Sequence, residues 1–334
     1  MTNNEKRMSF SERNRKSGGY LLRKKIGEII FRVFRAILLF GLCFLILQPL
    51  LHKISLAFMT EDDLYDSTVI NIPRHFSYSA IQTAWKYLSG FKSFWTSTYI
   101  GILVGAVQVL ACTLVGYGFA RYKFPLKNFW FACVVLLIVV PPQTMITPMY
   151  LNFSHFDIFG IFQATLGHSL RLLGSFWTYL LVCMGCCGYK GGLYIYMMRQ
   201  HFRNEPKELE EAAYVDGCGH LRTFWSILLP GAKPMIASCF LFSFVWWWTD
   251  NIYSRVFFAR GAGWITISNC LASLVDTMRG DFVKRYGQGY MVPTAYTQQI
   301  LATATMLSII PLMIIYVLAQ KSFVESISQS GIKG

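Results

Sequence analysis

The stretch PKELEEAAYVDGCGHLRTFWSILLP, residues 206–230, is a short polar segment between two long apolar segments. It fits the pattern E-A-A-x3-G-x9-I-x-L-P without a gap, from Glu211 to Pro230. The pattern fixes seven residues over twenty positions, which makes it a specific signal. Because the segments on either side are long and apolar enough to cross a bilayer, the sequence predicts a polar hairpin that joins two membrane helices.

The composition of the chain indicates a membrane protein. Of its 334 residues, 54% are apolar and only 14% are charged, against about 25% charged residues in ordinary globular proteins. Several apolar blocks reach the roughly 20 residues that a helix needs to span a bilayer. We therefore expect an all-α integral membrane protein with about six transmembrane helices, and a cytoplasmic hairpin between spans four and five. The apolar blocks are Ala36–Leu51, Phe94–Ala120, Phe129–Val140, Phe176–Met198, Met235–Trp248 and Ile300–Gln320.

Glycine and proline predict how the spans pack and where they break. The third block ends at Pro141-Pro142, so we expect a kinked or broken helix there. The fourth block is interrupted by 188–192, which favours one long helix preceded by a re-entrant or interfacial piece. The second block contains glycines that would let neighbouring helices approach closely. They are Gly101, Gly105, Gly116 and Gly118.

Half of the net charge lies before the first expected span. The chain carries a formal charge of +14, and residues 1–35 hold ten Lys or Arg against three Glu, a net +7. A nucleic-acid-binding arm and a cytoplasmic flank are the two interpretations of such a segment. A basic run that directly abuts an apolar span is typical of the positive-inside rule, so we expect no nucleic-acid partner. The first helix is then a retained signal anchor, and both termini are cytoplasmic.

Within the hairpin, the residue types predict two short helices and a tight turn. Asn204 is expected to cap the first helix, with Pro206 in its first turn. Gly217 allows the positive φ that a tight reversal needs. The first helix carries acids near its positive end, where negative charge is stabilised, and small residues that leave a contact face for another protein. These residues are Glu210, Glu211, Ala212 and Ala213.

This hairpin resembles the coupling loop, or EAA motif, of the carbohydrate-uptake branch of ABC importers, the maltose-type, binding-protein-dependent permeases. The segment 121–125 is similar to the basic turn that follows the second span in that family, and 142–150 to its third-helix exit. Residues 240–250 resemble its fifth-helix segment, with Thr249 where the family usually has Asn. Residues 321–334 resemble its C-terminal tail.

The resemblance implies a permease subunit that is not itself an enzyme. Its domains would be a basic cytoplasmic segment at 1–28, a transmembrane permease domain at 29–320 with the coupling loop at 199–234, and a cytoplasmic tail at 321–334. It would move a sugar or oligosaccharide by alternating access across a bacterial cell membrane. The residues implied in coupling to the ATPase are Glu210, Glu211, Ala212, Ala213, Asp216, Gly217, Ile227, Leu229 and Pro230.

The same resemblance implies several partners. The chain has no G-x-x-x-x-G-K-[ST] phosphate loop, so ATP and Mg²⁺ would be bound by two partner ATPase subunits, and this chain would hold no cofactor. The other implied partners are a second, related permease, an extracytoplasmic solute-binding protein, the sugar and membrane lipid. We assign no metal, because no His pair lies near the cysteines at 183–187.

A candidate substrate pathway lies at the end of the fifth block. Sugars are bound by aromatic stacking and by polar groups, which makes Trp246, Trp247, Trp248, Asp250 and Asn251 the candidates. An interfacial belt of tryptophans explains the same run equally well. Lys190 and Arg171, if they lie within the bilayer, are expected to face protein or water rather than lipid.

Other functional classes leave different signatures. A membrane-embedded enzyme would need a cluster of His, Asp or Glu within the spans, and no Ser-His or paired-carboxylate constellation is evident. A channel would be expected to show a selectivity filter or a ring of charges. A permease for an amino acid, a peptide or an anion is the closer alternative, against which the sugar-type fifth-helix segment and tail argue.

Overall fold

A computed structural model of the chain describes residues 18–157, 160–258, 263–289 and 291–331, the last eleven of these by their backbone alone. Over these ranges the chain is almost entirely helical, with two isolated β-bridges and no strand. The expected all-α class is confirmed. The chain divides into two compact units, Met1–Phe76 and Ser77–Gly334, which are described separately.

The first unit consists of one long helix and a short ordered loop. Helix α2, Tyr20–Phe58, contains Pro49 and exposes apolar side chains around almost its whole length, as a helix that faces lipid does. A short helix, α3 (Glu61–Tyr65), follows it. The buried carboxylate of Asp63 accepts the backbone N–H groups of Arg74 and His75, both at 2.8 Å, and these bonds, that of His75 foremost, lower the pKa of the carboxyl. Most of the basic segment 1–28 lies outside the described residues.

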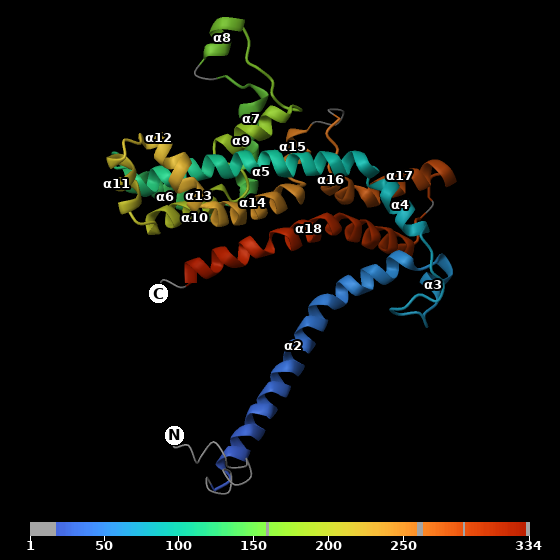
Figure 1. The fold of residues 1–334 in the computed structure, drawn as a ribbon. Coiled ribbons are helices and arrows are strands. Elements are labelled where there is room, and N and C mark those ends of the chain that lie inside the picture. Colours follow the sequence, from blue (N-terminus) through green and yellow to red (C-terminus); the bar gives the residue numbers. More distant parts are fainter. Residues whose placement is uncertain (1–17, 158–159, 259–262, 290, 332–334) are drawn as a thin grey trace. The chain divides into compact units, whose positions relative to one another are not determined.

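The second unit is a bundle of helices of very unequal length (Figure 1). Its elements are α4 (Ser79–Tyr87), α5 (Gly90–Arg121), α6 (Lys127–Val139), α7 (Pro142–Ser154), α8 (Ile161–Leu166), α9 (Phe176–Met184), α10 (Gly191–Asn204), α11 (Glu208–Val215), α12 (His220–Thr223), a π-helical turn (Phe224–Leu228), α13 (Leu229–Gly231), α14 (Lys233–Trp248), α15 (Tyr253–Phe257), α16 (Ile267–Ala272), α17 (Leu274–Tyr286) and α18 (Thr294–Gly331).

Fewer uninterrupted spans are present than the expected six. Within the described ranges, Tyr20–Phe58, Gly90–Arg121 and Thr294–Gln320 are long and apolar enough to cross a membrane. The number rises to five if each of two bent pairs is one span. One pair is α6 with α7, bent by 108° beside the expected break at Pro141-Pro142, and the other is α12–α13 with α14, bent by 75°. The fourth apolar block is divided into α9 and α10 by residues 185–190.

Helix α5 is the element around which this unit packs. It contacts α9, α10 and α14 along its length. A Cβ atom added at Gly116 would lie 2.7 Å from Cβ of Met198 in α10, and one added at Gly101 would lie 2.8 Å from the ring of Phe244 in α14. Close approach at Gly101, Gly105 and Gly116 is therefore confirmed. The prediction for Gly118 is wrong, because nothing lies within 4 Å of its would-be Cβ, which faces away from the neighbouring helices.

The pair Gly116 and Gly118 gives a direct test of this packing. Replacing Gly116 by valine should force α5 and α10 apart and cost about 1–3 kcal/mol of stability, the usual cost of overpacking. Gly118→Val is the matched control, since both residues lie in the same helix and suffer the same change in helix propensity. The thermal unfolding midpoint of the detergent-solubilised protein is the measurement. Equal midpoints for the two variants would contradict the packing.

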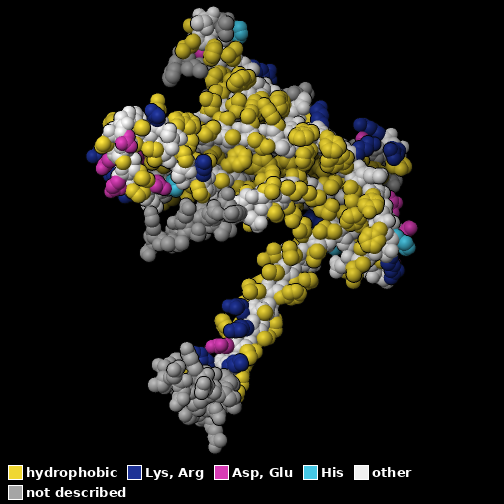
Figure 2. Space-filling model, in the orientation of Figure 1, with side chains coloured by type: hydrophobic (Ala, Val, Ile, Leu, Met, Phe, Trp, Pro, Cys, Tyr) yellow, Lys and Arg dark blue, Asp and Glu magenta, His cyan; other side chains and the backbone are white. Residues whose placement is uncertain are grey.

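Charged and apolar side chains are distributed unevenly along the length of this unit. Figure 2 shows charged side chains gathered toward its ends, one of which carries α11 and α12, while the middle of the face is mainly hydrophobic. An apolar middle between charged ends matches a bilayer, whose hydrocarbon core is about 30 Å thick.

Candidate functional site

Two places in the second unit hold the candidate residues, and the first is the charged hairpin, residues 199–234. It forms a helix-turn-helix in which α11 and α12 are joined by a turn with Gly217 at φ 81°. The positive φ expected at Gly217 is confirmed. The prediction that Asn204 caps the first helix is wrong. Because a residue before proline is held out of the helical region, Glu205 is extended, α10 ends at Asn204 and α11 begins at Glu208.

The coupling candidates divide between an exposed and a buried set. Glu211, Ala212, Asp216, Gly217 and Pro230 are exposed, whereas Ile227 and Leu229 are half-buried. Glu210 and Ala213 are buried against the rest of the unit. The hairpin also exposes large apolar side chains that the motif does not mark. These are Leu209, Tyr214, Val215, Leu221 and Trp225.

The hairpin is fastened to the end of α5 by a buried ion pair. The guanidinium of Arg121, the last residue of α5, pairs with the carboxylate of Glu210, and only 7% and 10% of the two side chains are exposed. Nη2 of Arg121 also donates a hydrogen bond to the backbone carbonyl of Glu205 at 2.9 Å. One side chain therefore fixes both the entry to α11 and its first turn. The sequence offered no signal for this pair, whose members lie far apart in the chain.

Aromatic packing holds the second half of the hairpin. The ring of Phe224 lies 4.7 Å from that of Tyr117 in α5 and 6.2 Å from that of Phe202 in α10. Phe224 and Leu228 are buried in the same cluster. The hydroxyl of Tyr214 makes a 2.8 Å hydrogen bond with Nδ1 of His220, and burial foremost raises the pKa of this phenol. The buried side of the hairpin is thus packed against α5 and α10, and this packing positions its exposed residues.

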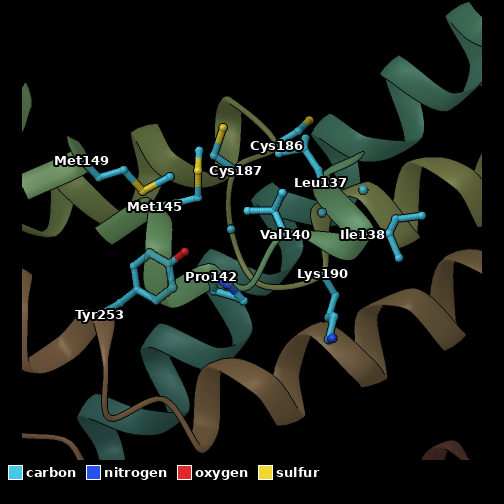
Figure 3. Close-up of a pocket in the computed structure, with 13 residues that line it drawn as sticks. Leu137, Ile138, Val140, Pro142, Met145, Met149, Cys186, Cys187, Lys190 and Tyr253 are labelled. Carbon is cyan, nitrogen blue, oxygen red and sulfur yellow. The ribbon is translucent and has the colours of Figure 1, made fainter. Parts of the chain in front are cut away.

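The second place is where three helices are interrupted, and we call it the break site. The interruptions are 140–141 between α6 and α7, 185–190 between α9 and α10, and 249–252 between α14 and α15. Residues of the first two, with Tyr253, line a narrow cavity of about 40 Å³ (Figure 3). A second cavity, of about 250 Å³, is lined by the start of α7 and by residues of the second and third interruptions. Interrupted helices within a membrane persist where protein or water surrounds the freed backbone.

A buried glutamine connects the helices at the break site. Nε2 of Gln108 in α5 donates to the carbonyl oxygen of Tyr189 at 2.6 Å. Its Oε1 accepts Nε1 of Trp247 at 2.6 Å and the hydroxyl of Ser243 at 3.1 Å. This amide therefore satisfies a carbonyl that the break between α9 and α10 leaves unpaired, and it joins α5 to α14 at the same point.

Asp250 organises the third interruption. Its carboxylate, 4% exposed, accepts the hydroxyls of Tyr189 at 2.6 Å and Tyr179 at 3.0 Å. It also accepts three backbone N–H groups that open α15, at 2.9–3.0 Å, those of Ile252, Tyr253 and Ser254. Five donors on one carboxylate give Asp250 the geometry of a helix cap tied to α9.

The structure separates the five pathway candidates. Trp246, Asp250 and Asn251 line the 250 Å³ cavity. Trp247 and Trp248 are each 2% exposed. Trp247 is held by Gln108, whereas Trp248 donates to the carbonyl of Ser308 at 3.1 Å and borders another cavity, of about 270 Å³. Lys190 and Gln143 also line the 250 Å³ cavity, which no local sequence pattern predicted.

No metal-binding group of three or more His, Cys, Asp or Glu residues occurs in the parts of the chain that are described. The nine cysteines carry free thiols there.

Comparison with known proteins points to one family. Residues 112–329 match the model of the binding-protein-dependent transport system inner membrane component. The chain is 27% identical to the maltodextrin transport system permease protein MdxG of Bacillus subtilis, over 70% of this chain and 73% of that protein. It is 26% identical to the polygalacturonan/rhamnogalacturonan transport system permease protein YtcP of the same organism, over 90% and 97%.

A solved structure shares the fold. A chain of a bacterial ABC transporter involved in the import of the acidic polysaccharide alginate superposes with a TM-score of 0.64 at 20% identity, over 89% of this chain and 98% of that chain.

Proposed function

This chain belongs to the binding-protein-dependent transport system inner membrane components and is a non-catalytic permease subunit of an ABC importer, and we propose that it moves a sugar or oligosaccharide. In this family the permease is an integral membrane component that works with ATPase subunits and a substrate-binding protein. The E-A-A-x3-G-x9-I-x-L-P pattern of the charged hairpin is the observation that supports a coupling role for this part of the chain.

The charged hairpin is the proposed contact with the ATPase. Glu211, Ala212 and Asp216 are exposed on it, and Val215 and Leu221 expose 87% and 78% of their surfaces. An apolar patch rimmed by charge is typical of a protein interface. Glu210 and Ala213 are buried, so in this proposal they hold the hairpin's shape, while the exposed residues touch the partner. ATP and Mg²⁺ then belong to two ATPase subunits.

The proposed topology has six spans and both termini in the cytoplasm of a bacterial cell. The spans are α2, α5, α6, the broken pair α9–α10, α14 and α18. An even number of spans puts the two termini on one side, together with the charged hairpin. Residues 1–28 and 321–334 would be the cytoplasmic ends, and 29–320 the permease domain. The excess of Lys and Arg before α2 supports this orientation.

The substrate pathway is proposed to run past the break site and between this chain and a second, related permease. Trp246 and Asn251 offer an aromatic face and an amide to the 250 Å³ cavity, the combination by which proteins bind sugars. The names of two relatives, a maltodextrin permease and a polygalacturonan/rhamnogalacturonan permease, support a saccharide as cargo. An amino acid, a peptide or an anion is the alternative cargo.

Uncoupling variants test this function. Glu211→Lys reverses an exposed charge on the hairpin, and Gly217→Val places a β-branched residue at φ 81°. We expect either change to lower ATP-driven uptake at least about tenfold, Glu211→Lys through the loss of a charged interface contact and Gly217→Val through a strained turn, while the spans still insert. Lys86→Gln, at an exposed position of α4 outside the hairpin, is the control. Uptake and ATP turnover are measured on the same reconstituted complex.

Purification of the chain in mild detergent identifies the partners. An ATPase and a second permease should co-purify, and the sample should hydrolyse ATP. Normal coupled uptake in both hairpin variants would overturn the coupling role. Recovery of the chain alone in several detergents, without ATP turnover, would overturn the proposed assembly.

A further inference from the structure

Lys190 occupies an unusual position in the break site. It is the residue before α10, and its backbone has φ 57° in the left-handed region. Figure 3 shows Cys186 and Cys187 at one end of the loop between α9 and α10, and Lys190 at the other. Lys190 lines the 250 Å³ cavity together with the start of α7 and residues of the interruption between α14 and α15. A lysine costs free energy when it is taken out of water, unless a counter-charge meets it.

The ammonium group of Lys190 has no carboxylate partner in the described part of the chain. Its Nζ lies 5.2 Å from the centroid of the Trp246 ring, a cation–π contact, and none of the ion pairs within the described residues includes it. Asp250 is the other charged residue that lines this cavity. The carboxylate of Asp250 already accepts five hydrogen bonds from α9, the α9–α10 loop and α15, so its acceptor sites are committed to protein donors.

The remaining walls of the cavity suit a sugar ring that carries a carboxylate. The rings of Tyr189 and Trp246 stack at 5.6 Å, and Nζ of Lys190 lies 5.2 Å from the centroid of the same indole, so an aromatic pair and an ammonium group are neighbours. Gln143, Thr249 and Asn251 add side chains that can donate and accept hydrogen bonds. The volume, about 250 Å³, lies just below the range of about 300–1,000 Å³ that is common for ligand pockets. Such a cavity fits part of a ligand shared with a second subunit.

We propose that the cargo is an anionic saccharide, one that contains uronate residues, and that Lys190 binds its carboxylate during passage. This inference rests on the proposed sugar permease function and adds the charge of the substrate to it. The carboxylate of the cargo supplies the counter-charge that Lys190 lacks, the aromatic pair of Tyr189 and Trp246 supplies a surface against which a sugar ring packs, and the polar residues meet the hydroxyls. The cavity then selects acidic over neutral sugars.

The test compares two versions of the same importer. The whole complex, with its ATPases, second permease and binding protein, is reconstituted in vesicles of phosphatidylcholine, with this chain as wild type or Lys190→Gln. Uptake is measured for galacturonate, glucuronate and mannuronate oligomers of two to four residues, for their methyl esters, and for neutral oligomers of glucose, galactose and arabinose. Because the binding protein is common to both versions, its own selectivity cancels.

We expect Lys190→Gln to lower the kcat/KM for an acidic oligomer about 10- to 100-fold, the loss that follows when a charge-assisted hydrogen bond is removed. Uptake of any ester or neutral oligomer that the wild type carries should change little. Lys190→Arg keeps the charge and should retain most of the uptake, and Lys86→Gln, at an exposed lysine of α4, is the control for loss of a positive charge. Added salt should weaken acidic uptake in the wild type.

Each other outcome decides against the proposal in a distinct way. Uptake of neutral oligomers that Lys190→Gln leaves intact, with no acidic oligomer carried, overturns this inference and keeps the sugar permease. An equal loss for acidic and neutral oligomers assigns Lys190 a structural role. An effect that appears only when phosphatidylglycerol is added assigns the ammonium to a lipid headgroup. No uptake of any saccharide overturns the proposed function and, with it, this inference.

Discussion

Replacement of Asp250 by leucine is expected to destabilise the second unit by roughly 3–5 kcal/mol, the scale for removing one side of a buried polar or ionic contact. Because leucine is similar in size to aspartate, the loss of stability comes from hydrogen-bond donors left without an acceptor and not from a cavity. Two tyrosine hydroxyls and three backbone N–H groups would lose their acceptor in an apolar region. The measurement is the unfolding midpoint of the detergent-solubilised complex, with uptake in parallel.

Two milder variants test whether the loss of stability comes from the hydrogen bonds to Asp250. Asp250→Asn keeps one oxygen but turns an amide NH₂ toward donors such as the N–H of Ser254, so we expect an intermediate loss. Tyr179→Phe removes one donor and leaves the carboxylate with four, so it should cost only about 1 kcal/mol. A stability of Asp250→Leu equal to that of the wild type would show that the five hydrogen bonds contribute nothing.

Replacement of Arg121 by methionine is expected to free the charged hairpin from α5. Glu210 would be left as an unpaired buried carboxylate, which costs about 3–5 kcal/mol. The hairpin escapes this cost by opening and exposing Glu210 to water. Amide hydrogen exchange of residues 205–219 should therefore accelerate at least about 100-fold relative to the wild type, and coupled uptake should fall with it.

The controls for Arg121 lie beside it. Lys123→Met removes a positive charge two residues further on, from an exposed position, and should leave hairpin exchange unchanged. Arg121→Lys keeps the charge but cannot contact Glu210 and the carbonyl of Glu205 together with one planar group, so it should give a partial effect. Unchanged exchange in Arg121→Met would mean that the ion pair does not hold the hairpin.

Features that depend on near neighbours in the chain were predictable from the sequence. The break beside Pro141-Pro142 follows from a missing donor and a steric clash, and the turn at Gly217 from the φ that glycine allows. Gly116 was predicted as a contact point because small residues recur where membrane helices meet. Gly118 could not be distinguished from it, because the direction in which each glycine faces depends on the partner helix. The six-span count stays a prediction.

Features that depend on distant pairs were not predictable. Gln108 meets Trp247 across 139 positions of sequence, and only the folded bundle brings them together. The same holds for Arg121 and Glu210. In the sequence, Arg121 is explained by a basic turn after a span and Glu210 by the acidic start of a helix, so neither residue indicates the other. Lys190 was noticed as a charge within an apolar block, but its cavity is made by two interruptions and the start of α7, which no local pattern relates. The roles of the coupling and pathway residues stay predictions as well.

Helix α10 links the break site to the charged hairpin. Its first residue, Gly191, lies at the break site and its last, Asn204, at the charged hairpin. Fourteen residues make a rod about 20 Å long, and an uninterrupted helix bends little. The rod ends at two interruptions of the helix, one at 185–190 and one at 205–207. If a partner displaces the hairpin, we expect α10 to carry that displacement along its axis to the cavity, and a solute bound in the cavity to bias the position of the hairpin in return.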